Sequence, residues 1–426
     1  MVRTKRVVKI ATLSVALLAV APPAFAAGAL DLTFGTNGTT LTSFDTQQQK
    51  TVSGVDDQAI QGDGKIVVAG VTAIDEPTPS YDVVVLRYST DGTLDPTFGT
   101  GGAEKIPVGG SASVGGLAID QKGRILVDGA EGGNGFVIRL TDAGVPDASF
   151  GGTGTVFLSP PGHTYTEVRD LLIVGRARPL LVGGSLNSAD EDLMLTRLLP
   201  SGALDSSFGS SGYSFLTVPG GGSMSGFTSA RGPYGTTVVG GWMTPTSGRT
   251  SSTLFRFTAS GAPDATFSGD GVRPFWVGGP GLAPEPTGIV VRSSGVVVLS
   301  NVVPSSGSAV FGLTAFTANG QLDRTFGGGD GKQVYDPTDA SDIAHDLALQ
   351  GDGSLVMVGG SQASVLVMRV SASGAPDASF GPGGLVVGAP DPSAYSSASA
   401  VSLQGDGKIV TSGGSGKAIF VERFAG

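Results

Sequence analysis

The chain has 426 residues, of which 40% are hydrophobic and 15% are charged, and its formal net charge at pH 7 is −10. This length allows two or three ordinary domains or one large repeat domain, and the acidic balance disfavours nucleic acid and anionic membranes as partners. The chain contains no Cys and only two His residues, which excludes disulfides, thiolate catalysis, iron–sulfur clusters and histidine-rich zinc sites. The 70 Gly and 25 Pro residues recur at regular places, which indicates turns between strands and an all-β fold.

Residues 1–26 have the pattern of a cleavable export signal. Four Lys and Arg residues precede an uncharged apolar run at residues 10–20, and Ala24-Phe25-Ala26 offers the small residues that a signal peptidase needs. The alternative is an uncleaved anchor, but the apolar run is shorter than the roughly 20 residues of a membrane span. We therefore predict cleavage after Ala26 and a secreted or extracytoplasmic protein whose mature chain has no membrane span and a net charge of −14, because four cations leave with the signal.

A nine-residue phrase such as LDPTFGTGG (residues 94–102) occurs seven times, at intervals of 52 to 64 residues. Such a period marks a supersecondary unit that stacks on copies of itself. Each copy carries an Asp that is followed three residues later by a Phe. The Asp residues are Asp31, Asp95, Asp147, Asp205, Asp264, Asp323 and Asp377, and the Phe residues are Phe34, Phe98, Phe150, Phe208, Phe267, Phe326 and Phe380.

Each unit also contains three apolar runs and a shorter fourth one. The phrase AIQGDGKIVVAG (59–70) and its relatives predict a hairpin with a tight turn. A third run such as DVVVLRY (82–88) precedes the Asp phrase, and a fourth such as GAEKIPV (102–108) follows it. Four strands per unit are typical of a propeller blade, so the sequence predicts a single seven-bladed β-propeller over residues 27–426. Because the last unit stops where the others enter the Asp phrase, we expect the strand after Gly38 to complete the seventh blade and close the ring.

The repeated side chains suggest their own roles. The Asp, with Ser or Thr two residues later, favours an Asx-type turn, and the Phe would fill the gap between neighbouring blades. In five units an Arg stands eight residues before the Asp, and in the interrupted blade the corresponding Arg lies near the end of the chain. The fifth unit has Ala315 at this position, and Arg324 follows its Asp directly. We expect these Arg residues to pair with the Asp residues, bidentately if the geometry allows; they are Arg87, Arg139, Arg197, Arg256, Arg369 and Arg423.

With these phrases laid out, the chain resembles the delta-60 repeat family of bacterial β-propellers, whose units carry LDxTFGxxG and QxDGKIxxxG. The resemblance covers residues 27–426, and it implies the fold and export but no shared activity, so no catalytic residue is carried over. The third and fourth units depart from the pattern, because GRARPLLVGG (175–184) and RGPYGTTVVGG (231–241) replace the usual hairpin turn.

The best candidate site is the beginning of the first strand of each blade, which faces the central channel of a propeller. Aligned on the hairpin glycine, five residues fall in adjacent columns: Asp56, Asp57, Asp170, His345 and Asp346. Glu167, Glu285 and Asp342 lie slightly upstream, on loops that would rim one mouth. Converging carboxylates could hold Ca²⁺, and a His beside an Asp could act as a general base; the plainer interpretation is that these residues cap strand ends beside solvent.

Aromatic residues with polar tips occur in several loops and would suit sugar or peptide stacking, although single aromatics more often pack; they are Trp242, Trp276, Tyr81, Tyr165, Tyr213, Tyr335 and Tyr395. Three functions remain open. The first choice is an exported binding module, expected to be a monomer, for a glycan, a cell-wall component or a protein, with no identifiable catalytic residue. The others are a metal-assisted lyase or hydrolase at the channel mouth and a structural surface protein.

Overall fold

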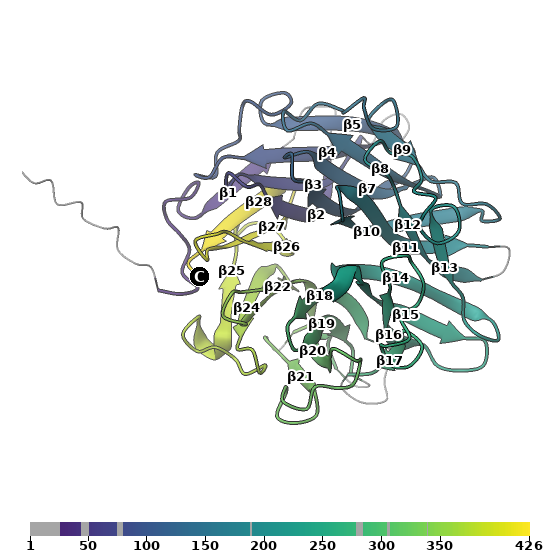
Figure 1. The fold of residues 1–426 in the computed structure, drawn as a ribbon. Coiled ribbons are helices and arrows are strands. Elements are labelled where there is room, and N and C mark those ends of the chain that lie inside the picture. The colour runs from purple at the N-terminus through teal and green to yellow at the C-terminus, as the bar shows by residue number, and fades with distance from the viewer. Residues whose placement is uncertain are drawn as a thin grey trace, which may run out of the picture.

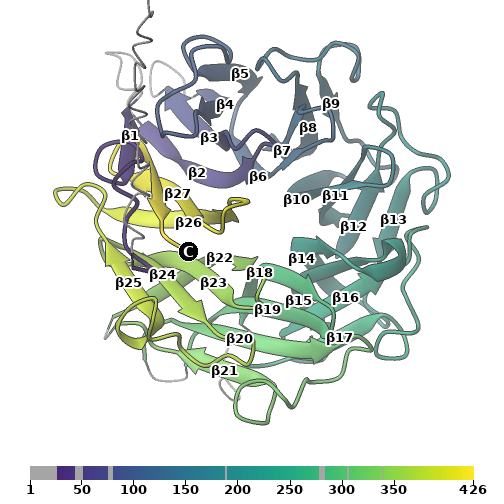
Figure 2. The same cartoon turned by 60° about the vertical axis from the view of Figure 1, so that its left-hand side comes forward.

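The computed structural model describes residues 26–43, 51–74, 80–187, 190–277, 284–304, 307–338 and 340–426. These residues form seven antiparallel sheets of four strands each, arranged as a ring, which confirms the predicted seven-bladed β-propeller (Figure 1). The first strand of each blade lies nearest the axis of the ring, and the fourth lies at the rim (Figure 2). Apart from Ala26, the predicted export signal lies outside the described residues.

The strands follow the blades in chain order. Blades one to three comprise β2 (Thr51–Ile60), β3 (Ile66–Ile74), β4 (Ser80–Tyr88) and β5 (Ala103–Gly109); β6 (Ala112–Ile119), β7 (Ile125–Glu131), β8 (Asn134–Leu140) and β9 (Thr155–Phe157); and β10 (Tyr165–Val174), β11 (Arg178–Leu186), β12 (Glu191–Arg197) and β13 (Tyr213–Leu216). Blades four and five comprise β14 (Gly222–Arg231), β15 (Thr237–Pro245), β16 (Ser251–Phe257) and β17 (Val272–Phe275); and β18 (Glu285–Arg292), β19 (Gly295–Val302), β20 (Val310–Thr317) and β21 (Lys332–Tyr335).

Blade six comprises β22 (Asp342–Leu349), β23 (Leu355–Ser361), β24 (Ser364–Val370) and β25 (Leu385–Gly388). Blade seven contains β26 (Ser396–Leu403), β27 (Ile409–Ser415) and β28 (Ala418–Phe424), and its fourth strand is β1 (Thr39–Ser43) from the other end of the chain. Strand β1 pairs antiparallel with β28, with Leu41 opposite Phe420. The predicted closure is therefore confirmed, and it covers the edge of β28 that an open ring would expose.

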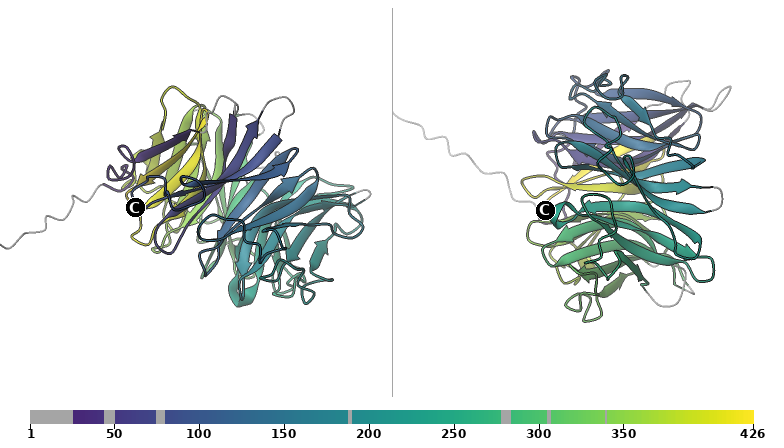
Figure 3. Two further views of the ribbon diagram at one scale, coloured as in Figure 1. Left: turned by 90° about the horizontal axis from the view of Figure 1, so that it is seen from above. Right: turned by 45° about the vertical axis from the view of Figure 1, so that its right-hand side comes forward.

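The hydrophobic core lies between neighbouring blades, whose sheets pack face to face around the ring (Figure 3). One cluster, for example, joins Val67 and Val83 of blade one to Leu117 and Ile125 of blade two, and all four side chains are nearly or fully buried. The motif Phe residues pack within these joints, as expected. Phe98 is fully buried, and a Cβ added at Gly144 of the next blade would lie 2.8 Å from its ring, so that turn needs a glycine.

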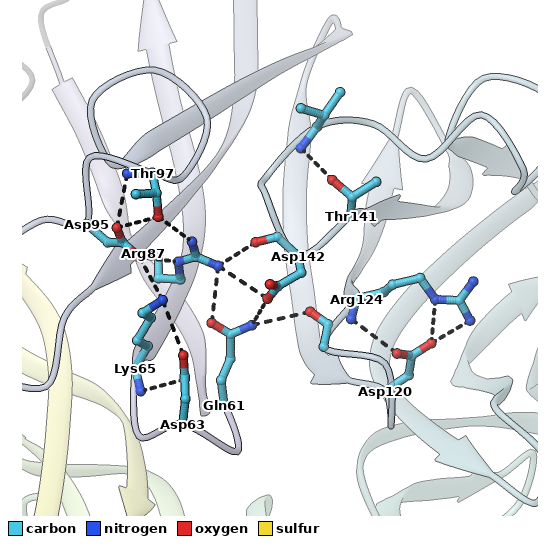
Figure 4. A network of polar contacts seen from close by, with 12 residues as sticks. Gln61, Asp63, Lys65, Arg87, Asp95, Thr97, Asp120, Arg124, Thr141 and Asp142 are labelled. Atoms are coloured by element: carbon cyan, nitrogen blue, oxygen red, sulfur yellow. Dashed lines mark hydrogen bonds and ion pairs between the residues drawn. The ribbon is translucent and has the colours of Figure 1, made fainter.

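The motif Asp and Arg residues meet in a repeated network that joins neighbouring blades (Figure 4). In blade one, Oδ1 of Asp95 accepts hydrogen bonds from the backbone N–H and hydroxyl of Thr97, which forms the expected Asx-type turn. The Arg87 guanidinium donates through Nε to Oδ2 of Asp95 over 2.9 Å, through Nη2 to Thr97 and through Nη1 to the backbone carbonyl of Asp142 in blade two. With a further contact from Nη1 to Oε1 of Gln61, the guanidinium divides its donors among four partners and does not form the bidentate pair with Asp95 that the sequence suggested.

This network keeps the motif carboxylates ionised. In the closing blade, burial opposes the charge of Asp31, but hydrogen bonds from Thr33 and the positive charge of Arg423 outweigh it and lower the pKa of Asp31 to about 2. A second cation, Lys408, lies in the turn between the strands β26 and β27, and its Nζ is 3.3 Å from Oδ2 of Asp31.

Five of the six repeated Arg residues also donate to a backbone carbonyl of the next blade, so the motif acts as a joint between blades. Among the described residues, Arg369 donates only to Asp377 and Ser379 of its own blade.

Blade five, which lacks the repeated Arg, recruits a replacement from its first strand. Nη2 of Arg292, at the end of β18, lies 3.0 Å from Oδ2 of Asp323, and its Nη1 donates to the backbone carbonyl of Ala372 in blade six. Its guanidinium also lies 5.5 Å from the ring centre of Phe326. Arg324, which directly follows the Asp in the sequence, is exposed, so the neighbouring cation suggested by sequence is not the one that pairs.

The two atypical hairpins still form. In blade three Val174 pairs with Arg178, and Ala177 adopts a φ of 55° in the turn. In blade four Arg231 pairs with Thr237 across a short 3₁₀ turn, η1 (Pro233–Gly235), and a second such turn, η2 (Pro382–Gly384), precedes β25. The different turn sequences therefore change the hairpin tips and leave the blades intact.

Candidate functional site

All seven first strands carry a β-bulge at the same level of the ring. In β2 the pairing with β3 shifts between Val55 and Asp57, so that Asp56 is the extra residue. Corresponding shifts occur in β6, β10, β14, β18, β22 and β26. A bulge bends the strand and redirects its extra side chain. The extra residues are Asp56, Gly115, Arg169, Phe227, Thr287, His345 and Ser399.

These seven bulge residues, one from each blade, line a single cavity of about 250 Å³ at the axis of the ring. Asp57, Asp170 and Asp346, the residues that directly follow three of the bulges, line it as well. The five residues predicted from the sequence are thus brought together, from blades one, three and six. Sequence reasoning missed Arg169, Phe227, Thr287 and Ser399, because a bulge has no signature in a first strand unless the repeats are already aligned on it.

The three carboxylates that follow the bulges each join two blades. One oxygen of Asp57 accepts the backbone N–H of Gln58 over 2.7 Å, and the other accepts the N–H of Leu117 in blade two over 2.6 Å. Asp346 does the same with Leu347 and, over 2.8 Å, with Val401 in blade seven.

Asp170 accepts the N–H of Leu171 over 2.7 Å and both the N–H and hydroxyl of Ser229 in blade four. These bridging carboxylates join blades one and two, three and four, and six and seven. Their lone pairs are used by the backbone, so they are first of all interblade joints at the channel wall.

A fourth buried carboxylate, Asp128 on β7, escaped the sequence analysis. It lies opposite the bulge of β6, where two glycines leave room for it: a Cβ at Gly115 or Gly116 would lie 2.7 or 2.9 Å from one of its oxygens. Asp128 is fully buried, and neither of its oxygens has a hydrogen-bond partner among the described residues. Its one sequence signal is a single Asp within the otherwise apolar run ILVDGA.

The wall of the cavity favours neutral forms of its acids and of its histidine. Burial raises the pKa of Asp346 to about 7 and, against the opposing hydrogen bonds, that of Asp170 to about 6. Burial and the charges of neighbouring carboxylates raise the pKa of Asp57 and Asp128 well above the usual range. Burial lowers the pKa of His345, so its imidazole is neutral at pH 7.

Asp56 differs from the bridging carboxylates, because its side chain keeps contact with the solvent of the channel. The enclosing walls raise the pKa of Asp56 to about 7 by burial, so its protonated and ionised forms are both populated at neutral pH. Asp56 and His345 therefore offer an acceptor and a neutral imidazole to whatever occupies the axis of the ring.

A second cavity of about 550 Å³ opens beside the axial one. The two share Asp56, His345 and Ser399, and the second is lined further by Ser397 and Tyr395. The Tyr395 side chain is 63% exposed. Hydroxyl, carboxylate, imidazole and an open aromatic ring thus surround one continuous hollow.

The upstream acids have separate surroundings. Glu167 accepts a hydrogen bond from Arg169 over 2.8 Å, and Glu285 lines a third cavity beside Trp242. Asp342, expected on a rim loop, is buried and accepts hydrogen bonds from the backbone N–H and hydroxyl of Thr338. Within the described ranges, no three acidic or histidine side chains are placed to share one metal ion.

The predicted loop aromatics divide into packing and surface residues. Tyr213 and Tyr335 are buried, and the hydroxyl of Tyr335 donates to the carbonyl of Gly374 over 2.6 Å. Tyr81 and Trp242 are partly buried. Trp276 and Tyr165 are 41% and 43% exposed. No helix in the described part of the chain has the length and hydropathy to cross a bilayer.

The fold and this site define a seven-bladed β-propeller with a polar cavity on its axis. The model of a β-propeller family of unknown function, DUF5122, matches residues 61–98 and 235–267, which supports a propeller repeat family. No curated protein matches the sequence.

Several solved structures share the fold. A catalytically inactive histidine-to-alanine variant of virginiamycin B lyase from Staphylococcus aureus, solved with quinupristin, is similar with a TM-score of 0.50 and 12% identity, over 90% of this chain and 98% of that one. The polysaccharide lyase Uly1 is similar with the same TM-score and identity, over 87% and 89% of the two chains. At this identity the likeness concerns the fold alone.

Proposed function

We propose that the protein is a glycan-binding module whose ligand sits at the axial cavity and its open neighbour. One observation carries this proposal: every blade contributes one bulge residue to a single polar cavity. Ring symmetry alone would repeat one side chain seven times, whereas these seven positions hold six different side chains and a glycine. A scaffold that is repetitive elsewhere and varied at one level suits recognition at that level.

The lining suits a polyhydroxylated ligand better than an apolar one. Asp56 and the hydroxyls of Ser397 and Ser399 can exchange hydrogen bonds with sugar hydroxyls, and neutral His345 can both donate and accept. The exposed ring of Tyr395 provides an apolar face with a polar tip, which suits stacking on a pyranose. A glycan is therefore favoured over the other ligand classes expected from the sequence.

The test is a glycan binding screen with the purified protein and two tyrosine variants. Tyr395→Ala should weaken the binding of any glycan hit at least fivefold, because its ring leaves the open cavity. Tyr234→Ala is the matched control, since Tyr234 is 99% exposed but lies in the hairpin η1, on the opposite face. Equal affinity of both variants would place the ligand elsewhere, and the lack of any hit would favour a structural surface protein.

A second candidate, catalysis at the same cavity, is favoured by the presence of Asp56 and a neutral His345 in the lining of both cavities. A neutral imidazole can act as a general base at pH 7. If the protein is a lyase or hydrolase, wild type will degrade the bound glycan, and His345→Gln will bind it without turnover. Calcium binding stays a prediction: a rise in melting temperature with millimolar Ca²⁺, reversed by chelator, would support the metal-assisted form.

We also infer that the chain is exported and belongs with the delta-60 repeat propellers. The first inference rests on the basic, apolar and small-residue pattern of residues 1–26. The second rests on the two phrases that recur in fixed order in the blades, and the partial match to a propeller repeat family agrees with it.

A further inference from the structure

A third cavity extends the two already described across the same face of the ring. It measures about 440 Å³ and is lined by Phe227, Trp242, Thr244, Thr250, Pro284 and Glu285. Phe227 also lines the axial cavity, so the third cavity adjoins the axial one on the side of blades four and five. The open cavity with Tyr395 adjoins it on the side of blades seven, one and six.

The three cavities thus lie side by side on one face of the ring, and we call this row of cavities the channel-mouth trough. Its ends are marked by aromatic residues, Tyr395 at one end and Trp242 at the other. Its middle is the axial cavity with its seven bulge residues. A single cavity of a few hundred Å³ is enough for a small molecule, so a trough of three suits an extended ligand.

The Trp242 end is built from fixed side chains. Trp242 stands on β15 opposite Ser225 and Ser252, and the hydroxyls of Thr244 and Thr250 lie 2.7 Å apart. The Phe227 ring is held by Arg169, whose guanidinium lies 4.7 Å from its centre. Aromatic rings next to paired hydroxyls and a carboxylate repeat the chemistry of the Tyr395 end.

The charge of the trough selects among extended ligands. Burial favours the neutral forms of Asp57, Asp170 and Asp346 at the axis, and Glu285 lines the Trp242 end. The one guanidinium at the axis, Arg169, is already paired with Glu167 over 2.8 Å and lies 3.8 Å from Glu191. Little positive charge is therefore left to compensate an anionic chain for the water that its charges would lose in the trough.

We propose that the channel-mouth trough binds a linear, neutral or amino-sugar oligosaccharide that crosses the axis of the ring from Tyr395 to Trp242. This inference rests on the proposed glycan-binding function and adds the length and charge of the ligand. A chain that contacts both aromatic ends gains affinity with each added unit until the trough is full. A disaccharide can engage one end only.

The test is calorimetric titration with three ladders from disaccharide to hexasaccharide: N-acetylglucosamine oligomers, their deacetylated glucosamine counterparts and galacturonate oligomers. We expect the neutral or cationic hexasaccharide to bind at least tenfold more tightly than the disaccharide, and the galacturonate hexasaccharide to bind at least tenfold more weakly than both. Trp242→Ala and Tyr395→Ala should each weaken hexasaccharide binding about tenfold, while only one of them should affect the disaccharide.

Trp276→Ala is the control, because Trp276 is an exposed tryptophan at the end of the same blade and lines none of the three cavities among the described residues. Melting temperatures of all variants separate lost binding from lost folding. Equal affinity for disaccharide and hexasaccharide, with sensitivity to Tyr395→Ala alone, would overturn the trough and leave the binding module standing. Tightest binding of galacturonate would overturn the charge argument, and no binding by any ladder would overturn both proposals.

Discussion

Arg292 replaces the missing motif Arg of blade five, although nothing in the repeat pattern marks this residue. We therefore predict that the substitution Arg292→Ala destabilises the protein. The substitution removes the ion pair with Asp323, the hydrogen bond to Ala372 and the contact with Phe326. It leaves the Asp323 carboxylate, whose side chain is 10% exposed, without that cation. Breaking a buried pair by removing one partner costs about 3–5 kcal/mol.

We expect the lower end of that range, about 3 kcal/mol, because Thr325 still donates two hydrogen bonds to Asp323. Unfolding entropy of about 2 cal/mol/K per residue amounts to about 0.8 kcal/mol/K for roughly 400 residues, so the melting temperature should fall by about 3–4 °C. Scanning calorimetry and urea unfolding of the purified protein measure this change.

Arg324→Ala is the matched control, since Arg324 is the exposed sequence neighbour of the same Asp. We expect its melting temperature to stay within about 1 °C of wild type, as for most exposed substitutions. An Arg292→Ala variant as stable as wild type, or an Arg324→Ala variant equally destabilised, would refute the replacement.

Three further predictions concern the joints, the ring and the leader. Burial raises the folded-state pKa of Asp170 to about 6 and of Asp346 to about 7, above the ordinary value near 4 in the unfolded chain. Their protonation therefore stabilises the folded state below about pH 4, and this contribution is lost as the pH rises toward 7. We expect urea unfolding to show on the order of 1–3 kcal/mol less stability at pH 8 than at pH 5. A stability that stays constant or rises over this range would contradict the raised pKa of the two carboxyl groups. Deleting residues 27–43 removes β1 and should lower the melting temperature by several degrees and promote aggregation through the freed edge of β28, whereas an unchanged transition would speak against closure. Intact mass of the exported protein should correspond to a chain starting at Ala27, and a mass that includes residues 1–26 would show that the leader is retained.

The sequence predicted the architecture well because its repeats carry turn chemistry at fixed intervals. Asp95, Phe98 and Arg87 stand where their spacing implied, and β1 closes the ring as the interrupted unit indicated. Such positions are readable because each needs a particular side chain: the Asp for its turn, the Phe for the joint, and the Arg for the next blade.

The candidate site was predicted in position but only partly in role. Alignment on the hairpin glycine brought Asp57, Asp170 and Asp346 into one column, yet it could not show that each accepts a backbone N–H from the following blade. That contact depends on how two bulged strands meet in space. Asp128 was missed for the same reason, since its place opposite two bulge glycines depends on cross-strand register.

Arg292 illustrates the limit most clearly. It lies 31 residues before Asp323, on the first strand of the blade instead of the third, and only the sheet brings the two together. Likewise Trp242 and Tyr395 are 153 positions apart in the sequence, and the ring places them at the two ends of one trough.

The most direct test of ligand binding across the axis is a crystal structure of the protein with a glucosamine or N-acetylglucosamine hexasaccharide bound. We expect sugar density that runs from Tyr395 past Asp56 and His345 to Trp242, with bulge residues of several blades in contact. Density confined to another face, or an axial cavity that stays free of sugar while the hexasaccharide is bound elsewhere, would contradict binding across the axis.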